Sequence, residues 1–425
     1  MTTIDTVSAP QPYRTSNDLG LGLLRQPTTV LFGPGQRRQI PHLVEGIAGQ
    51  VLMVTDDRMS RSAEFAGIVD GIAARGVSVL TYAETEPDLP RRNVVDIAAG
   101  FGGATVDAIV GIGGGSCMDL AKVASVVLAN KGDVRDYYGE FLVPGSGCPV
   151  ITVPTTGGTG AEVTCISVVF DEEKAMKVGV ASPHLEAFAA VIDPELTLSC
   201  PPGLTAAAGA DALSHLIESF TGRAKNPGPD DLATKLYAGK NLLADVYART
   251  GLGLLNTSLP AVVVDPGDLK ARSDTLFGAY CAGMAINTAG TAGAHAIQSP
   301  IGNLTHTAHG FGISALLPYV MRYNLPARVH EFAEIGRVLG VANATDPDLA
   351  QAHCAIERIE AILDTLGAPL DLRTLGLSES DFGFVADQAM LATRLTANNP
   401  RELTVPAIVA ILERGYAGDR TWWEL

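Results

Sequence analysis

The stretch TAAAGADALSHLIESF, residues 205–220, has a helical pattern with small residues ahead of Asp211. Asp211 and His215 are four residues apart, so on a helix their side chains stack on one face. A carboxylate and an imidazole on one face can supply half of a metal site. An ordinary Asp–His hydrogen bond is the commoner explanation of such a pair, so the pair by itself predicts little.

The segment GTAGAHAIQSPIGNLTHTAHGFG, residues 290–312, supplies candidates for the other half of this metal site. With His295 and His309, the set becomes one carboxylate and three imidazoles, which suits Fe²⁺, Zn²⁺ or a similar ion with open positions. His306 competes with His309, from which it is three residues away. We favour His309 as the metal ligand because it lies at the start of a helical apolar run. His306 would then face the cleft beside the metal site.

The first half of the chain, residues 25–200, alternates short apolar runs with helical patterns. This alternation predicts a mostly parallel, doubly wound α/β sheet. Residues 164–173 and 176–183 are expected to form a β-hairpin instead. The expected sheet strands lie within 28–35, 51–57, 77–82, 107–116, 149–154 and 189–196.

The second half, residues 201–425, has long amphipathic segments and no clear strand, which predicts an all-α domain. Asp346 and Thr404 are candidate helix starts, and Gly367 is a candidate stop. A polar arm is expected over residues 1–24. The expected helices beyond 205–220 cover roughly 231–249, 268–290, 309–323, 329–340, 347–366, 379–394 and 404–417.

The motif GIGGGSCMDLAK, residues 111–122, lies between an expected strand and an expected helix. Glycines at 113–115 allow a pyrophosphate to approach the backbone, the helix N-terminus supplies N–H donors, and Ser116 adds a hydroxyl. A tight strand–helix turn would also use glycine. Three glycines followed by serine favour phosphate binding, although the pattern differs from GxGxxG.

Two further segments are candidates for coenzyme binding. Asp56 ends an earlier strand, where a carboxylate can bind an adenosine ribose and repel a 2′-phosphate, favouring NAD over NADP. A helix N-cap is an equally good explanation, and Asp57 competes with Asp56. The loop PTTGGTGAEVT, residues 154–164, presents hydroxyls on Thr155, Thr156 and Thr159 after the last core strand.

Composition limits the classes of protein to consider. The net charge of −16 argues against nucleic acid or an anionic membrane as partner. We expect a cytoplasmic protein, because no signal peptide or membrane span is visible and the six cysteines are scattered like free thiols. His42, His184, His330 and His353 are expected to be ordinary surface or core residues.

These motifs together resemble the iron-containing (group III) alcohol dehydrogenases. The resemblance rests on GGGSxxDxAK, PTTxGTGAEVT, GADALSHLIES, HxxxxPxG from His295 to Gly302, and AHGFGISALLPYVMRYN, and it spans nearly the whole chain from Pro27. It implies a dinucleotide-binding domain and a helical domain with the metal and nicotinamide between them. It also implies a homo-oligomer and a small alcohol or aldehyde as substrate.

The resemblance assigns roles to individual residues. It implies metal ligation by Asp211, His215, His295 and His309. It implies coenzyme binding by Asp56, Gly113, Gly114, Gly115, Ser116, Asp119, Thr155, Thr156 and Thr159. Many members carry a further histidine near the nicotinamide, where this chain has Ser299. As a hypothesis, His306 or a water held by Ser299 replaces that histidine in proton transfer.

The predicted function is NAD-dependent interconversion of a primary alcohol and its aldehyde, with Fe²⁺ or alternatively Zn²⁺. A metal-independent reductase of the maleylacetate type is one rival, and the intact set of four ligands argues against it. A transhydrogenase that keeps its nicotinamide bound is a second rival. A non-catalytic protein that has kept the fold is the third.

Overall fold

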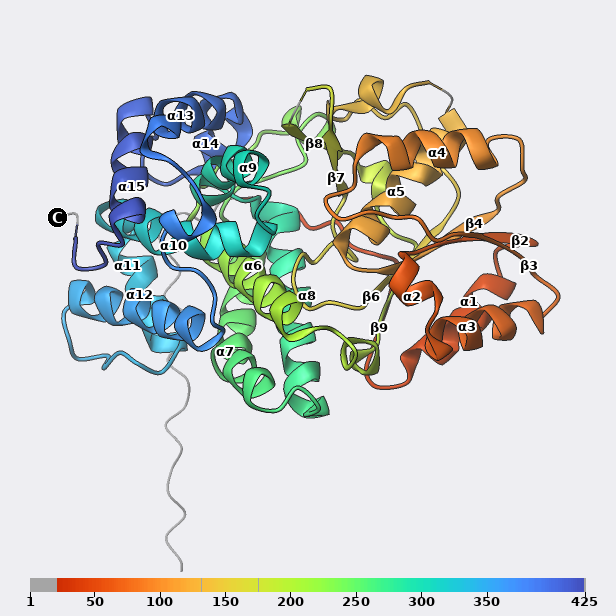
Figure 1. The fold of residues 1–425 in the computed structure, drawn as a ribbon, viewed down its shortest axis with the longest axis horizontal. Coiled ribbons are helices and arrows are strands. Elements are labelled where there is room, and N and C mark those ends of the chain that lie inside the picture. The colour runs from red at the N-terminus through yellow and green to blue at the C-terminus, as the bar shows by residue number, and fades with distance from the viewer. Residues whose placement is uncertain (1–20, 131, 175, 424–425) are drawn as a thin grey trace, which may run out of the picture.

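The computed structural model describes residues 21–130, 132–174 and 176–423 (Figure 1). An α/β half and a helical half lie side by side, at the right and left of Figure 1 respectively. This arrangement confirms the predicted fold class. The first twenty residues of the expected N-terminal arm lie outside the described residues. No helix among the described residues is long and apolar enough to cross a membrane.

The main sheet of the α/β half has six strands, all paired in parallel. The carboxyl ends of these strands therefore point to the same edge, where open α/β sheets bind ligands. In order across the sheet the strands are β1 (Thr29–Phe32), β9 (Ala189–Ile192), β6 (Val150–Pro154), β4 (Ala108–Gly113), β2 (Gln50–Val54) and β3 (Ser78–Tyr82).

Helices cover both faces of this sheet, as the continuous apolar strands require. Alternate residues of β2 and β4 face opposite cores. Leu52 and Ile109 pack with α4 (Arg91–Phe101) and α5 (Gly115–Asn130). Met53 and Val110 pack with α1 (Ile40–Glu45) and α3 (Ala63–Ala73). The short helix α2 (Asp57–Ser60) follows β2 directly.

The predicted hairpin is confirmed. Strands β7 (Ile166–Asp171) and β8 (Met176–Ala181) pair antiparallel, and the two-residue β5 (Gly139–Glu140) pairs parallel to β8. Three-residue and four-residue 3₁₀ turns occur elsewhere in this half. They are η1 (Gln36–Gln39), η2 (Val134–Tyr137), η3 (Pro183–Leu185) and η4 (Pro194–Thr197).

The helical half begins with α6 (Pro202–Thr221), whose side chains from Thr205 onward are almost all buried. The other helices pack around it and share one large apolar core. These helices are α7 (Leu242–Val264), α8 (Leu269–Ala289), α9 (Gly293–Thr305), α10 (His309–Asn324), α11 (Val329–Val338), α12 (Asp348–Thr365), α13 (Phe382–Leu391), α14 (Thr393–Asn398) and α15 (Val405–Ala417). The 3₁₀ turns here are η5 (Asp231–Ala233), η6 (Leu325–Ala327), η7 (Arg373–Leu375) and η8 (Glu379–Asp381).

Two expected helices differ from the observed ones. The helix expected over 231–249 starts at Leu242, because the Asn241 side chain caps it and Gly239 has φ +73° in an isolated bridge with Ala224. It then continues to Val264 through two glycines. The helix expected over 379–394 is divided at Ala392, whose ψ of 58° is not helical.

Two of the three predicted helix ends are confirmed, and one is wrong. Thr404 caps α15 by accepting a hydrogen bond from the Ala407 N–H, as predicted. Gly367 follows α12 with φ +64°, consistent with the predicted stop. Asp346 is not a cap, because α12 begins only at Asp348. The expected helices leave out the segment around His295, yet α9 runs through it with Pro300 in its interior.

Candidate metal centre

Asp211 and His215 lie one turn apart on α6, as their spacing predicts, and the helix is held by close packing on its neighbours. The Asp211 Oδ1 and His215 Nε2 atoms are 3.5 Å apart. Both side chains are more than nine-tenths buried. Burial at this level is unusual for a carboxylate, and it requires a charged or hydrogen-bonding partner.

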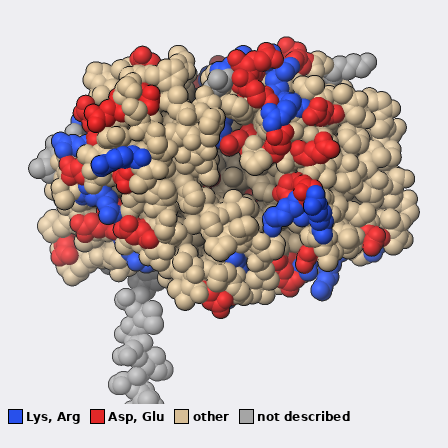
Figure 2. All heavy atoms as spheres, viewed as in Figure 1, with Lys and Arg blue, Asp and Glu red and all other residues tan. Residues whose placement is uncertain are grey.

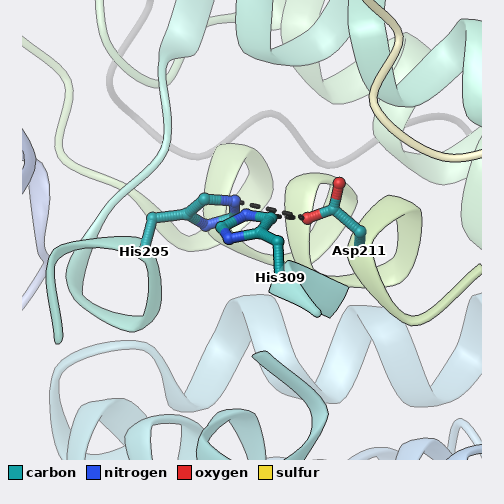
Figure 3. Close-up of side chains that lie close together, drawn as sticks. All are labelled: Asp211, His295 and His309. Atoms are coloured by element: carbon teal, nitrogen blue, oxygen red, sulfur yellow. Dashed lines mark ion pairs between the residues drawn. The ribbon is translucent and has the colours of Figure 1, made fainter. Parts of the chain in front are cut away.

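The other two histidines reach Asp211 from α9 and α10. His295 Nε2 lies 3.5 Å and His309 Nε2 lies 3.4 Å from Asp211 Oδ1 (Figure 3). The ligand atoms of Asp211, His295 and His309 all lie within 4.8 Å of one another. His215 joins this set through its Nε2 atom, 3.0 Å from His295 Nε2.

Close contact between helix backbones places His309 at this point. A Cβ atom on Gly310 would lie 1.9 Å from the Ala207 carbonyl oxygen, so only glycine lets the start of α10 approach α6. His309 is the residue before this contact and the first residue of α10. Gly310, next to the third histidine, therefore sets the distance between two helices that carry candidate ligands.

The spacing of these atoms fits a cation between them. Ligands about 2.1 Å from an ion, at tetrahedral or octahedral angles, are separated by roughly 3.0–3.4 Å. Asp211 Oδ1, the atom that all three histidines approach, is buried and has no aligned hydrogen-bond partner among the described residues. An N3O donor set of this kind suits Fe²⁺ or Zn²⁺.

Glu218 orients His295, a role that was not predicted from sequence. Its Oε2 atom lies 2.6 Å from His295 Nδ1, and the carboxylate also accepts the Ala292 and Ala294 N–H groups. A proton on Nδ1 leaves His295 Nε2 facing Asp211 as a ligand atom. Glu218 lies three residues after His215 on the same face of α6, and this spacing is the signal that could have identified it.

Electrostatics favour the protonation state that a metal ligand needs in most of these four residues. Burial lowers the pKa of His215 to about 4 and lowers that of His309, despite the attraction of Asp211. Burial would raise the pKa of Asp211, but the surrounding imidazoles outweigh it and hold this pKa well below its ordinary value. Burial opposes the charge on His295, but Glu218 and Asp211 raise its pKa to about 9.

The glycine turn and the threonine loop (residues 154–164) meet at the carboxyl edge of the sheet. A Cβ on Gly115 would lie 2.7 Å from Thr159 Cγ2, and a Cβ on Gly114 would lie 3.7 Å from Thr156 Oγ1. Gly113 has φ +152° and joins β4 to α5. Thr155 donates its backbone N–H to the Gly113 carbonyl at 2.8 Å. Its side chain is buried.

Asp56 and Asp57 are separated by their contacts. Asp56 Oδ1 caps α2 by accepting the Met59 N–H at 2.7 Å, and its Oδ2 faces Cys117 behind Gly113. Asp57 is exposed and pairs with Arg61. Asp56 is therefore both an N-cap and the carboxylate beside the glycine turn, so the two explanations of this residue are compatible.

Three predicted site residues lie apart from these groups. Asp119 faces Lys122 and the backbone of β7, away from the glycine turn. Ser299 is half-buried on α9, and His306 is exposed with φ +52° where α9 ends. Among the described residues, the hydrogen bonds of the ligand set involve neither Ser299 nor His306.

The four histidines expected to be ordinary have unrelated partners. His42 contacts Arg75, His184 contacts Ser146, His330 contacts Asp348, and His353 stacks on Trp423. The six cysteines are free thiols, as expected. In Figure 2 the surface is hollowed between the two halves, and charged side chains border the hollow on the α/β side.

Comparison with known proteins follows the same division into halves. The family described as "Iron-containing alcohol dehydrogenase" matches residues 27–194. The family described as "Fe-containing alcohol dehydrogenase family, C-terminal" matches residues 205–416.

Individual relatives match over nearly their full length. The chain is 33% identical over 382 residues to long-chain-alcohol dehydrogenase 1 of Geobacillus thermodenitrificans, covering 89% of this chain and 92% of the relative. It is 31% identical over 388 residues to NAD-dependent methanol dehydrogenase of Bacillus methanolicus, covering 91% and 98% respectively. A crystal structure of 1,3-propanediol oxidoreductase superposes with a TM-score of 0.86 at 29% identity, covering 93% of this chain and 100% of the other.

Proposed function

The chain belongs to the iron-containing alcohol dehydrogenase family, and from this membership we propose that it interconverts a primary alcohol and its aldehyde by metal- and NAD-dependent hydride transfer. The observation that carries the proposal is the cluster of Asp211, His295 and His309 from three helices, which His215 joins through its contacts with Asp211 and His295. A metal-independent reductase would have no need to bury one carboxylate among three imidazoles.

The four ligand residues would hold a divalent ion, Fe²⁺ or alternatively Zn²⁺. Such an ion polarises a substrate oxygen as a Lewis acid, while the nicotinamide of NAD exchanges the hydride. Asp211 supplies the negative charge that anchors the ion. Glu218 keeps His295 Nε2 directed at it. The apolar packing of α6 and α8–α10 limits water around the reacting atoms.

Coenzyme binding would use the carboxyl edge of the sheet. Gly114 precedes α5, and Gly115 and Ser116 begin it, so their backbone N–H groups would face a pyrophosphate bound there. Thr156 and Thr159, beside these glycines, add hydroxyl donors. The Asp56 carboxylate, whose Oδ1 accepts the Met59 N–H and whose Oδ2 faces the Cys117 thiol, would use its remaining lone pairs to accept a ribose hydroxyl. Its charge would repel a 2′-phosphate, which favours NAD over NADP.

Proton transfer to solvent would use His306 or a water held by Ser299. Ser299 is half-buried on α9, four residues after His295 and so on the same helix face, and His306 is exposed where α9 ends. His306→Ala tests this assignment. Unchanged turnover and an unchanged pH profile would remove His306 from the proposal and leave Ser299.

We also propose a domain boundary, a cellular location, an oligomeric state and the partners of the protein. The domain boundary falls at residues 200 and 201, just before α6 begins. The protein is proposed to be a cytoplasmic homo-oligomer with a small alcohol or aldehyde as substrate, and without nucleic acid or membrane partners.

The test is NADH formation by anaerobically purified chain supplied with Fe²⁺ or Zn²⁺, using a panel of primary alcohols and, in reverse, aldehydes. We expect turnover that disappears when a chelator removes the metal. Turnover that persists without metal would refute the proposal in favour of a metal-independent reductase. Nicotinamide that co-purifies and leaves only on denaturation would favour the transhydrogenase.

A further inference from the structure

The Lys122 side chain is fully buried in the α/β half, with its ammonium group in a shell of oxygen atoms. Nζ lies 2.9 Å from the Ala161 carbonyl oxygen, 3.1 Å from that of Thr164 and 2.5 Å from that of Ile166. The Thr164 hydroxyl lies at 3.3 Å, and Asp119 Oδ1 lies at 2.9 Å. These carbonyl and carboxylate oxygens surround the Lys122 ammonium in the way that oxygen ligands surround a bound monovalent cation.

The segment held by this ammonium is the end of the threonine loop. Ala161 donates its backbone N–H to Thr159 Oγ1 at 3.2 Å, and Thr159 lies against Gly115 at the start of α5. Lys122 itself lies two turns further along α5. One side chain therefore links the middle of the phosphate-facing helix to the loop that lies beside its first residues.

The same loop also contacts the helical half of the molecule. A Cβ on Gly158 would lie 2.8 Å from Ala208 on α6, and a Cβ on Gly160 would lie 2.2 Å from Gly283 on α8. The loop backbone thus packs directly on two helices of the metal-binding half. A shift of the loop would alter the coenzyme side and the metal side relative to each other.

The groups around Lys122 enclose its ammonium and keep it from contacting the coenzyme directly. Asp119 pairs with it, and the other Asp119 oxygen accepts the Val168 N–H at 3.0 Å. Glu162 is also buried near it, with one oxygen lacking a hydrogen-bond partner among the described residues. The Lys122 ammonium is enclosed by these groups, so it has no free face for a coenzyme phosphate.

We infer that Lys122 is a positioning residue, whose ammonium acts as a built-in monovalent cation that orders the threonine loop for coenzyme binding. The inference rests on the proposed NAD-dependent function. It also changes the expected role of Asp119, which becomes the counter-charge of Lys122 rather than a coenzyme contact.

The test begins with Lys122→Ala and measures NADH affinity by fluorescence titration. We expect the dissociation constant to rise about tenfold to a hundredfold, the range that misplaced supporting groups cost. Bound metal per chain should stay unchanged, because the four ligand residues lie on other elements. A merely structural role would not separate NADH affinity from metal content in this way.

Chemical rescue makes the test specific. The atoms that Lys122→Ala removes are those of propylammonium, so added propylamine should restore most of the NADH affinity of this variant. Lys122→Met fills the space with apolar atoms and should not be rescued. Lys240→Ala is the matched control, because Lys240 is also buried and its ammonium bonds to the Phe220 carbonyl and Asp245 rather than to the threonine loop. It should lower stability without changing NADH affinity.

Three results would overturn the inference. Wild-type-like NADH affinity in folded Lys122→Ala would show that the loop orders itself. Failure of every Lys122 variant to fold, judged by circular dichroism, would make Lys122 a residue of general stability. Wild-type protein that binds no NADH would instead refute the proposed function on which the inference rests.

Discussion

Replacing Gly310 by alanine tests how the metal centre is assembled without touching a ligand. The new Cβ would lie 1.9 Å from the Ala207 carbonyl oxygen and 2.5 Å from its carbon. Carbon and oxygen atoms ordinarily approach no closer than about 3.3 Å. The start of α10 must therefore move more than about 1 Å away from α6, whereas metal sites tolerate changes of about 0.2 Å in ligand distance.

Overpacking of this kind costs about 1–3 kcal/mol. If the chain relieves the strain by moving His309 away from Asp211, metal affinity should fall about 5-fold to 150-fold, since about 1.4 kcal/mol is tenfold. The assay is competition for the metal against a chelator of known affinity, on protein shown to be folded by circular dichroism. Gly203→Ala on α6 is the control, because its Cβ meets nothing within 4 Å. Metal affinity of folded Gly310→Ala within twofold of wild type would refute the reasoning.

Three further predictions concern carboxylates around the site. Glu218→Gln should lower metal affinity about 10-fold to 100-fold through loss of the charge that orients His295, and equal chelator competition in both proteins would contradict this. Asp56→Asn keeps the helix cap but removes the charge, so NADP should gain at least about tenfold in kcat/KM relative to NAD, and an unchanged ratio would refute this role. Burial raises the pKa of Glu162 from 4.5 to about 7, so wild type should lose up to about 3 kcal/mol of unfolding free energy as pH rises from 4.5 through 7. Urea unfolding at pH 5 and pH 8 checks this, and Glu162→Gln should lack the loss. Parallel pH dependence in the two proteins would count against it.

The parts of the structure that sequence predicted are those set by local pattern. The spacing of Asp211 and His215 placed them on one helix face, and the Gly113–Ser116 run placed a tight turn between strand and helix. The alternation of apolar runs and helical segments predicted the parallel sheet. In each case the physical cause acts within about one or two helical turns, so the residues themselves carry it.

The parts that sequence missed depend on contacts between distant segments. The start of α7 at Leu242 is set by Asn241 and a bridge to Ala224, and α9 continues through Pro300 because its packing outweighs local propensity. Nothing local shows that Lys122 meets the carbonyls of residues 161–166. The surroundings of Asp119 could not be predicted for the same reason, because Lys122 is one turn away but the other contacts come from β7.

Metal content tests the central claim most directly. Elemental analysis of anaerobically purified wild type and His295→Ala, combined with the rate of NADH formation from a primary alcohol, measures the site and the reaction together. We predict one divalent metal ion per wild-type chain, and loss of both metal and activity in His295→Ala while NADH binding remains. Metal-free wild type that turns over the alcohol would contradict the account.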